Sequence, residues 1–296
     1  MTMLDNTPQI SQEAVDLWGG RLTMRVNVAG AGAPLLYLHP AGGLAWDPFL
    51  SQLATRYTVY APELPGTSAG DPYAIHAVDE LSDLVLVYEE LVRRLGLERP
   101  VLVGQSFGGM LAAELAALYP GITEKLVLLD PLGLWREDAP IANPIAAAPH
   151  ELPGMLFHDP AGAAARAFLE PPADPEAAAA ATAAMVWALG CAGKFLWPVF
   201  DRGLRNRGHR ITAATLIVWG EQDALIPAAY AAEFQALIPD SQVVLVPECG
   251  HIPQVEQLEH TSAAVAEFLS ARGSMNQPLD IALCHTSTTG QHQRAS

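Results

Sequence analysis

The apolar positions of this chain fall into two alternating patterns. Short, mostly apolar runs predict strands at residues 35–38, 57–61, 101–104, 125–129, 215–219 and 242–246, and the first of them is fully apolar, as buried parallel strands are. Longer segments, in which apolar residues recur at helical spacing, predict helices at residues 79–95, 106–119, 228–237 and 259–271. Strands that alternate with helices predict an α/β fold, in which a mostly parallel sheet carries helices on both faces.

Parts of the chain depart from this alternation. Residues 14–28 predict an N-terminal antiparallel hairpin with paired glycines at its turn. Residues 137–210 are rich in Ala and Pro, and we interpret them as a helical cap inserted between two strands. The predicted core therefore comprises residues 8–136 and 211–272. Residues 273–296 are polar and lack periodicity, and we expect them to form a disordered tail.

The composition is that of an acidic globular protein. Half of the 296 residues are hydrophobic and the net charge is −16, so the chain lacks the basic face that a nucleic-acid partner requires. The same charge predicts repulsion from anionic membranes. The uncharged stretch from Ala177 to Gly193 is mostly alanine and predicts a cap helix, not a membrane span. Three widely spaced cysteines, and a start without a signal sequence, predict a cytoplasmic location.

A serine stands at a sharp turn between a predicted strand and a predicted helix. The five residues from Gly104 to Gly108 form this turn, with Ser106 at its centre. Such an elbow holds a nucleophile out of the sheet in a strained backbone geometry, and glycines give the turn room to close. Ser106 is therefore the candidate nucleophile.

Two further candidates follow the serine, each just after a predicted strand. His251 is the candidate base that takes the serine proton, and Asp223 would accept the other ring N–H of the imidazole. The chain order Ser, Asp, His is that of one of the convergent triad families. Asp130 also follows a predicted strand and is the alternative acid. Because Pro131 restricts the backbone of Asp130, we favour Asp223.

A serine nucleophile also needs two backbone donors for the oxyanion of its tetrahedral intermediate. The N–H of Phe107 directly follows the nucleophile at the start of a helix. The second donor is expected from the loop His39-Pro40-Ala41. Because Pro40 has no N–H, the candidate is Ala41.

These motifs resemble those of the α/β-hydrolase fold family, in its serine-nucleophile, esterase-like branch. The resemblance rests on residues 39–43, 104–108, 220–223 and 250–256, and covers residues 14–136 and 211–272. It implies an α/β-hydrolase sheet, a Ser-His-Asp triad and an acyl-enzyme intermediate. The family usually has His-Gly where this chain has His39-Pro40, so the oxyanion loop is the least typical part.

The resemblance implies a hydrolase of a small or medium apolar carboxylic ester, or a related acyl compound, without a cofactor or metal ion. Carbon–carbon bond hydrolases and cofactor-free perhydrolases also use a serine, and non-catalytic ligand-binding proteins share the fold, so these stay as alternatives. Large apolar side chains in the cap predict either an apolar substrate pocket or packing onto the core. The candidate substrate-binding residues among them are Trp187, Trp197, Phe157 and Met185. The natural substrate and the oligomeric state stay open.

Overall fold

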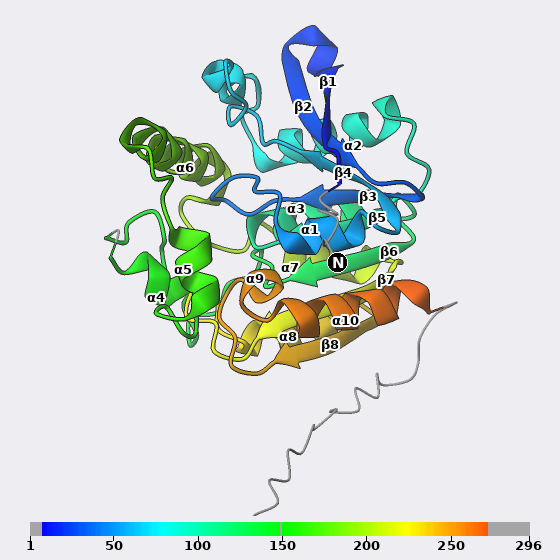
Figure 1. Cartoon of the computed structure of the whole chain (residues 1–296). Coiled ribbons are helices and arrows are strands. Elements are labelled where there is room, and N and C mark those ends of the chain that lie inside the picture. The colour runs from blue at the N-terminus through cyan, green and yellow to red at the C-terminus, as the bar shows by residue number, and fades with distance from the viewer. Residues whose placement is uncertain (1–7, 149, 272–296) are drawn as a thin grey trace, which may run out of the picture.

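An eight-stranded sheet forms the centre of the computed structural model, which describes residues 8–148 and 150–271 (Figure 1). The strand order is β1-β2-β4-β3-β5-β6-β7-β8. The pairs β1–β2 and β2–β4 are antiparallel, and all other neighbours are parallel. The strands are β1 (Ser11–Leu17), β2 (Leu22–Ala29), β3 (Ala33–Leu38), β4 (Tyr57–Pro62), β5 (Val101–Gln105), β6 (Lys125–Leu129), β7 (Ala214–Gly220) and β8 (Ser241–Val246). The predicted α/β fold and its N-terminal hairpin are confirmed.

Helices pack on both faces of the sheet, as predicted. One face is covered by α2 (Leu81–Arg94), α3 (Phe107–Leu118) and α8 (Ala229–Leu237), and the other by α1 (Pro48–Leu53) and α10 (Leu258–Ser270). The strand β6 shows why a strand between two helix layers is apolar after its first residue, Lys125. Leu126 and Leu128 pack into the first layer, and Val127 and Leu129 pack into the second.

The described residues between β6 and β7 add no strand to the sheet. It contains α4 (Leu152–Leu156), α5 (Ala163–Leu169), α6 (Pro175–Leu196) and α7 (Leu204–Arg207). The first three lie together at one end of the sheet, on the left of Figure 1. We keep the name cap for residues 137–210.

The helix α6 is attached to the core at several points. The ring of Phe195 stacks on that of Phe107, with centroids 6.4 Å apart. The indole N–H of Trp187 donates to the carbonyl of Gly66 at 2.8 Å. Among the described helices, α6 is the one long and apolar enough to span a membrane by length and composition, with a mean hydropathy of 1.4. These contacts show it packed on the core, as expected of a cap helix.

Two short helices were missed by the sequence predictions, namely α1 and α9 (Pro253–Glu256). The start of α1 does carry a signal, since Asp47 accepts a hydrogen bond from the N–H of Leu50 at 2.8 Å and a proline follows it. Both helices are too short to show helical periodicity. The predicted disordered tail, residues 273–296, lies outside the described residues.

Candidate active site

Ser106 lies on a tight turn between β5 and α3. Its backbone has φ 54° and ψ −113°, an unusual conformation for a residue with a side chain. The flanking glycines are required by close packing. A Cβ atom on Gly108 would overlap the carbonyl of Leu38, and one on Gly104 would overlap the carbonyl of Gly108. The sequence prediction of an elbow is thus explained by contacts that exclude any larger residue.

Three buried side chains form a continuous hydrogen-bonded chain at this elbow. The Oγ of Ser106 lies 2.8 Å from Nε2 of His251. The Nδ1 of the same imidazole lies 2.8 Å from Oδ2 of Asp223. With Nδ1–H donating to the carboxylate, Nε2 is free to accept the proton of the serine hydroxyl. The structure brings together the three residues that the sequence singled out as a triad.

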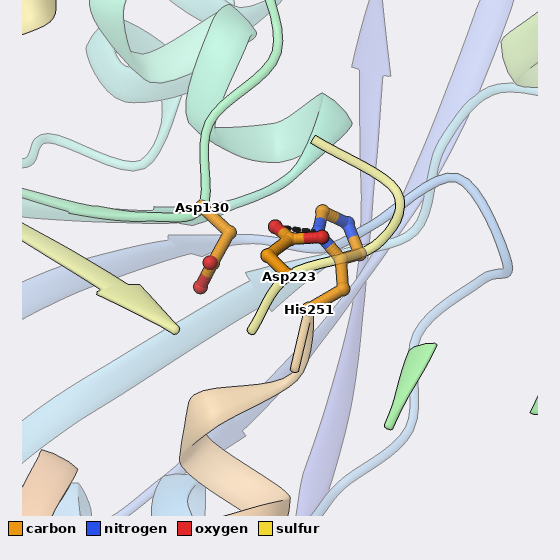
Figure 2. Close-up of side chains that lie close together, drawn as sticks. All are labelled: Asp130, Asp223 and His251. Atoms are coloured by element: carbon orange, nitrogen blue, oxygen red, sulfur yellow. Dashed lines mark hydrogen bonds and ion pairs between the residues drawn. The ribbon is translucent and has the colours of Figure 1, made fainter. Parts of the chain in front are cut away.

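Asp223, and not Asp130, is hydrogen-bonded to the imidazole. The second oxygen of Asp223 accepts the N–H groups of Leu225 and Ile226, both at 2.8 Å, which fixes the carboxylate toward the histidine. Asp130 lies beside this pair at the end of β6, and its Oδ1 accepts the N–H of Gly220 at 2.9 Å (Figure 2). Burial, and then the charge of Asp223, raise the pKa of Asp130 well above its ordinary value.

Among the described residues, one group of side chains is close enough to hold a metal ion, and it consists of the two aspartates and the histidine of this site. Ligand atoms of Asp130, Asp223 and His251 lie within 4.8 Å of one another. However, Nδ1 of the histidine and Oδ2 of Asp223 are hydrogen-bonded to each other, so a metal ion would have to break the bond that orients the imidazole. The arrangement fits a proton relay better than a metal site.

The loop that carries His251 is held by two residues that sequence reasoning missed. The side-chain amide of Gln105 donates to the carbonyl of His251 at 2.9 Å. The carboxylate of Glu256 accepts backbone N–H groups from Gly250 at 2.6 Å, and from His158 and Asp159 in the cap at 3.1 and 2.9 Å. Glu256 therefore ties the histidine loop to the cap. A glutamate five residues after the histidine was the available sequence signal.

The two candidate oxyanion donors lie at the elbow and in the loop after β3. Phe107 begins α3, so its N–H belongs to the first turn, where N–H groups have no partner within the helix. Ala41 lines the same cavity as Ser106. The loop of Ala41 is held by His39, whose Nδ1–H donates to the carbonyl of Pro40 at 2.7 Å and whose Nε2 accepts the N–H of Leu64 at 2.9 Å.

The buried imidazole of His39 should make stability depend on pH. Burial lowers its pKa from 6.5 to about 4, with a smaller opposing effect from the bond to the Pro40 carbonyl. The unfolded chain therefore binds a proton at His39 below about pH 6.5, whereas the folded chain does so only below about pH 4. Above about pH 6.5 the contribution of His39 to the free energy of unfolding is constant. Between about pH 6.5 and pH 4 this contribution decreases as the pH falls.

The measurement compares the wild type with His39→Gln by urea unfolding at pH 7 and pH 5. The stability advantage of the wild type should shrink by about 2 kcal/mol on acidification, because the variant lacks this proton linkage. Other titrating groups, such as the buried Asp47, are common to both proteins and cancel in the comparison. An advantage that stays equal at both pH values would contradict a buried neutral His39.

A cavity of about 210 Å³ opens onto Ser106 and His251. Its lining comes from the oxyanion loop, from the segment after β6, and from α4, α5 and α6. The polar side chains in the lining are Gln105, Asn143, Ser106 and His251, and no Arg, Lys, Asp or Glu is among the lining residues. The cavity can therefore accept an uncharged apolar group next to the serine.

Of the four cap residues predicted to bind substrate, only Met185 lines this cavity. The other three correct the expectation. The indole of Trp187 is hydrogen-bonded to the carbonyl of Gly66 on the core, and Trp197 is 59 % exposed. Phe157 is buried against Phe168, with ring centroids 5.7 Å apart. The helical register explains the difference. Met185 and Leu189 are four residues apart and share the cavity face of α6, whereas Trp187 lies between them on another face.

The end of the cap carries three arginines that contact the protein itself, namely Arg205, Arg207 and Arg210. Arg207 forms a two-point ion pair with the buried Glu114, with contacts of 2.6 and 2.9 Å. Arg205 pairs with Glu233 at 2.9 Å, and Arg210 donates to the carbonyl of Ala117 at 2.9 Å. These arginines are thus occupied on the core side, and none lines the cavity.

The sheet, the elbow and the Ser-His-Asp arrangement together define a hydrolase of the serine type. Residues 30–268 match the Alpha/beta hydrolase family, and the chain belongs to this family. It is 27% identical to a 2-hydroxy-6-oxo-6-phenylhexa-2,4-dienoate hydrolase of Burkholderia cepacia, over 83% of this chain and 91% of that protein. It is also 27% identical to Lipase 1 of Psychrobacter immobilis, over 85% of this chain and 81% of that protein.

Solved structures agree on the fold. A crystal structure of a membrane phospholipase A, described as a bacterial virulence factor, superposes with a TM-score of 0.71, at 24% identity, and covers 88% of this chain and 86% of that one. The protein is therefore an enzyme of the α/β-hydrolase type, as the sequence predicted. Since its relatives include both a hydrolase of a dienoate and a lipase, the bond that it cleaves is a separate question.

Proposed function

We propose that this protein hydrolyses a small or medium, uncharged, apolar carboxylic ester through an acyl-enzyme on Ser106. The observation that carries the proposal is the cavity beside the serine, whose lining is apolar apart from two amide side chains and the candidate catalytic residues themselves. An acyl or alcohol group without charge fits such a lining, whereas a carboxylate would enter it unpaired.

Each residue of the site has a defined role in the proposed reaction. His251 takes the proton of the Ser106 hydroxyl as Oγ attacks the ester carbonyl, and Asp223 stabilises the imidazolium that forms. The backbone N–H groups of Phe107 and Ala41 donate to the oxyanion. The imidazolium then gives its proton to the leaving alcohol, and a water molecule activated by the same histidine releases the acid from the serine.

Cleavage of a carbon–carbon bond is the second candidate, because several relatives are hydrolases of dienoates. Such substrates carry a carboxylate, which needs a cationic partner when it is buried. No cationic side chain is among the lining residues, so the ester is favoured. The perhydrolase and the non-catalytic binding protein share this geometry, and turnover assays separate them from the esterase.

The test is turnover of p-nitrophenyl esters of graded chain length, together with labelling by a fluorophosphonate. We expect labelling and turnover of neutral esters, with much weaker hydrolysis of an anionic 2-hydroxy-6-oxo-dienoate. Faster cleavage of the dienoate than of every ester would overturn the proposal in favour of the carbon–carbon hydrolase. Labelling without turnover of either substrate would indicate a binding protein.

The cavity also predicts which residue limits chain length. Leu189→Trp should fill part of the cavity that Leu189 lines. It should lower kcat/KM for the longest accepted ester by about tenfold or more relative to the shortest, because only the longer chain loses apolar contacts or is strained by the larger side chain. Trp197→Ala is the control, since Trp197 directly follows the same helix but is exposed and outside the lining. An equal loss on all esters for Leu189→Trp would contradict its place in the substrate cavity.

A further inference from the structure

A second buried carboxyl group lies beside the one that orients the histidine. Asp130 is fully buried, and it reaches Asp223 because β6 and β7 are neighbouring parallel strands. Its N–H donates to the carbonyl of Val218 at 3.0 Å, and its Oδ1 accepts the N–H of Gly220 at 2.9 Å. These bonds fix the side chain next to Asp223, as Figure 2 shows. Its Oδ2 has no hydrogen-bond donor among the described residues.

The two carboxyl groups differ in how many donors they receive. Asp223 accepts three, from the N–H groups of Leu225 and Ile226 and from Nδ1 of His251, each at 2.8 Å. Asp130 accepts one. Oxygen atoms of the two buried carboxyl groups lie within 4.8 Å of each other. Two carboxyl groups so close together in a buried site do not both carry a charge, and the proton stays on the group with fewer donors to stabilise its anion. This places the charge on Asp223 and the proton on Asp130.

We propose that Asp130 is a positioning residue that keeps its proton and donates a hydrogen bond from Oδ2 to the carboxylate of Asp223. The proposal rests on the proposed function of the triad. The proposed bond gives Oδ2 of Asp130 a hydrogen-bond partner. It also extends the hydrogen-bonded chain of Ser106, His251 and Asp223 to a fourth side chain. The raised pKa of Asp130 has the same cause, namely burial beside the charge of Asp223. The nearby Cys249 thiol adds no competing charge, because burial raises its pKa strongly.

The role of this bond is to hold Asp223 ionised and aimed at the histidine. A carboxylate inside the protein needs donors in place of water, and Asp130 supplies one from the side opposite the imidazole. The donated bond also withdraws part of the negative charge of Asp223. Its removal should leave that charge more available to the imidazolium, so that the histidine holds its proton to higher pH.

The backbone at Asp130 allows a matched pair of variants. Its φ is 42°, in the left-handed region, where Asn and Gly are both tolerated. Asp130→Asn keeps a donor toward Asp223 and an acceptor for Gly220, and should retain kcat within about threefold. Asp130→Gly does not strain the backbone, but it removes both the donor toward Asp223 and the acceptor for the N–H of Gly220. It should lower kcat about tenfold or more, the loss expected for a hydrogen bond to a charged group.

A pH profile separates positioning from mere structural support. The acid limb of kcat/KM should move to higher pH in Asp130→Gly and stay in place in Asp130→Asn. If the asparagine variant is as damaged as the glycine variant, the residue acts as an anion and the proposal is wrong. The proposal is also wrong if the glycine variant keeps full activity with an unmoved acid limb.

The proton itself can be observed without any assay of turnover. Infrared difference spectra at pH 8, wild type minus Asp130→Asn, should show the C=O stretch of a protonated carboxyl group, shifted by ¹³C labelling of aspartate. Other protonated groups are common to both proteins and cancel. A wild type without this band overturns the proposal even if the glycine variant does not fold. If the band is present but Ser106→Ala remains active, the proposed function fails and the protonation of Asp130 stands.

Discussion

Replacement of Ser106 by alanine is expected to abolish ester hydrolysis, with a loss of roughly 10⁴- to 10⁶-fold in kcat. The hydroxyl is the one group of the cavity placed to attack, since its Oγ lies 2.8 Å from the imidazole that would remove its proton. Without it no acyl-enzyme forms, and the histidine and the oxyanion donors can only assist a water molecule. The measurement is kcat on the best p-nitrophenyl ester.

The fold should survive this substitution. Alanine has the same Cβ as serine, so it adds no strain at the positive φ of the elbow. The elbow is held by backbone bonds, among them the N–H of Ser106 to the carbonyl of Leu129 at 2.9 Å. An unchanged melting temperature is the control for folding. Ser82→Ala, at an exposed position of α2, makes the same change of residue away from the site and should keep wild-type kcat. More than a tenth of the wild-type activity in Ser106→Ala would remove this residue from the mechanism.

The sheet and the elbow could be predicted because their signals are local. The strands β5 and β6 are apolar apart from Gln105 and Lys125 at their ends, and such runs are what a strand buried on both faces requires. The elbow adds glycines at positions where a Cβ would meet backbone atoms, those of β3 for Gly108 and those of α3 for Gly104. Since the ends of neighbouring parallel strands meet at one edge of the sheet, Ser106, Asp223 and His251 could be expected to converge.

The sequence did not predict which residues of the cap pack on the core and which line the cavity. Its main helix, α6, is largely alanine, so no apolar stripe marks the face that packs or the face that lines the cavity. Aromatic residues were therefore given the role of substrate contacts, yet Trp187 anchors the helix and Leu189 lines the cavity. The contacts of Glu256 join segments about a hundred residues apart, and no local pattern reports such a pairing.

The sequence offered two candidates for the catalytic acid, Asp223 and Asp130. The hydrogen bond of Asp223 to the imidazole predicts a second large loss of activity. Asp223→Asn should lower kcat by up to about 10⁴-fold. The oxygen of the new amide would keep the N–H groups of Leu225 and Ile226, which leaves its NH₂ facing Nδ1 of His251. An NH₂ group can only donate there, so the imidazole would take the tautomer with its proton on Nε2.

That tautomer cannot serve as the base. Its Nε2–H would point at the hydroxyl of Ser106, and the nitrogen that should accept the serine proton would already carry one. Asp130→Asn is the matched control, one strand away and equally buried, and should have far less effect, because Asp130 makes no bond to the imidazole and the amide preserves its contacts. The comparison is made by kcat at pH 8 on proteins shown to be folded by circular dichroism. If the larger loss belongs to Asp130→Asn, the catalytic acid lies at the end of β6 and its assignment to Asp223 is wrong.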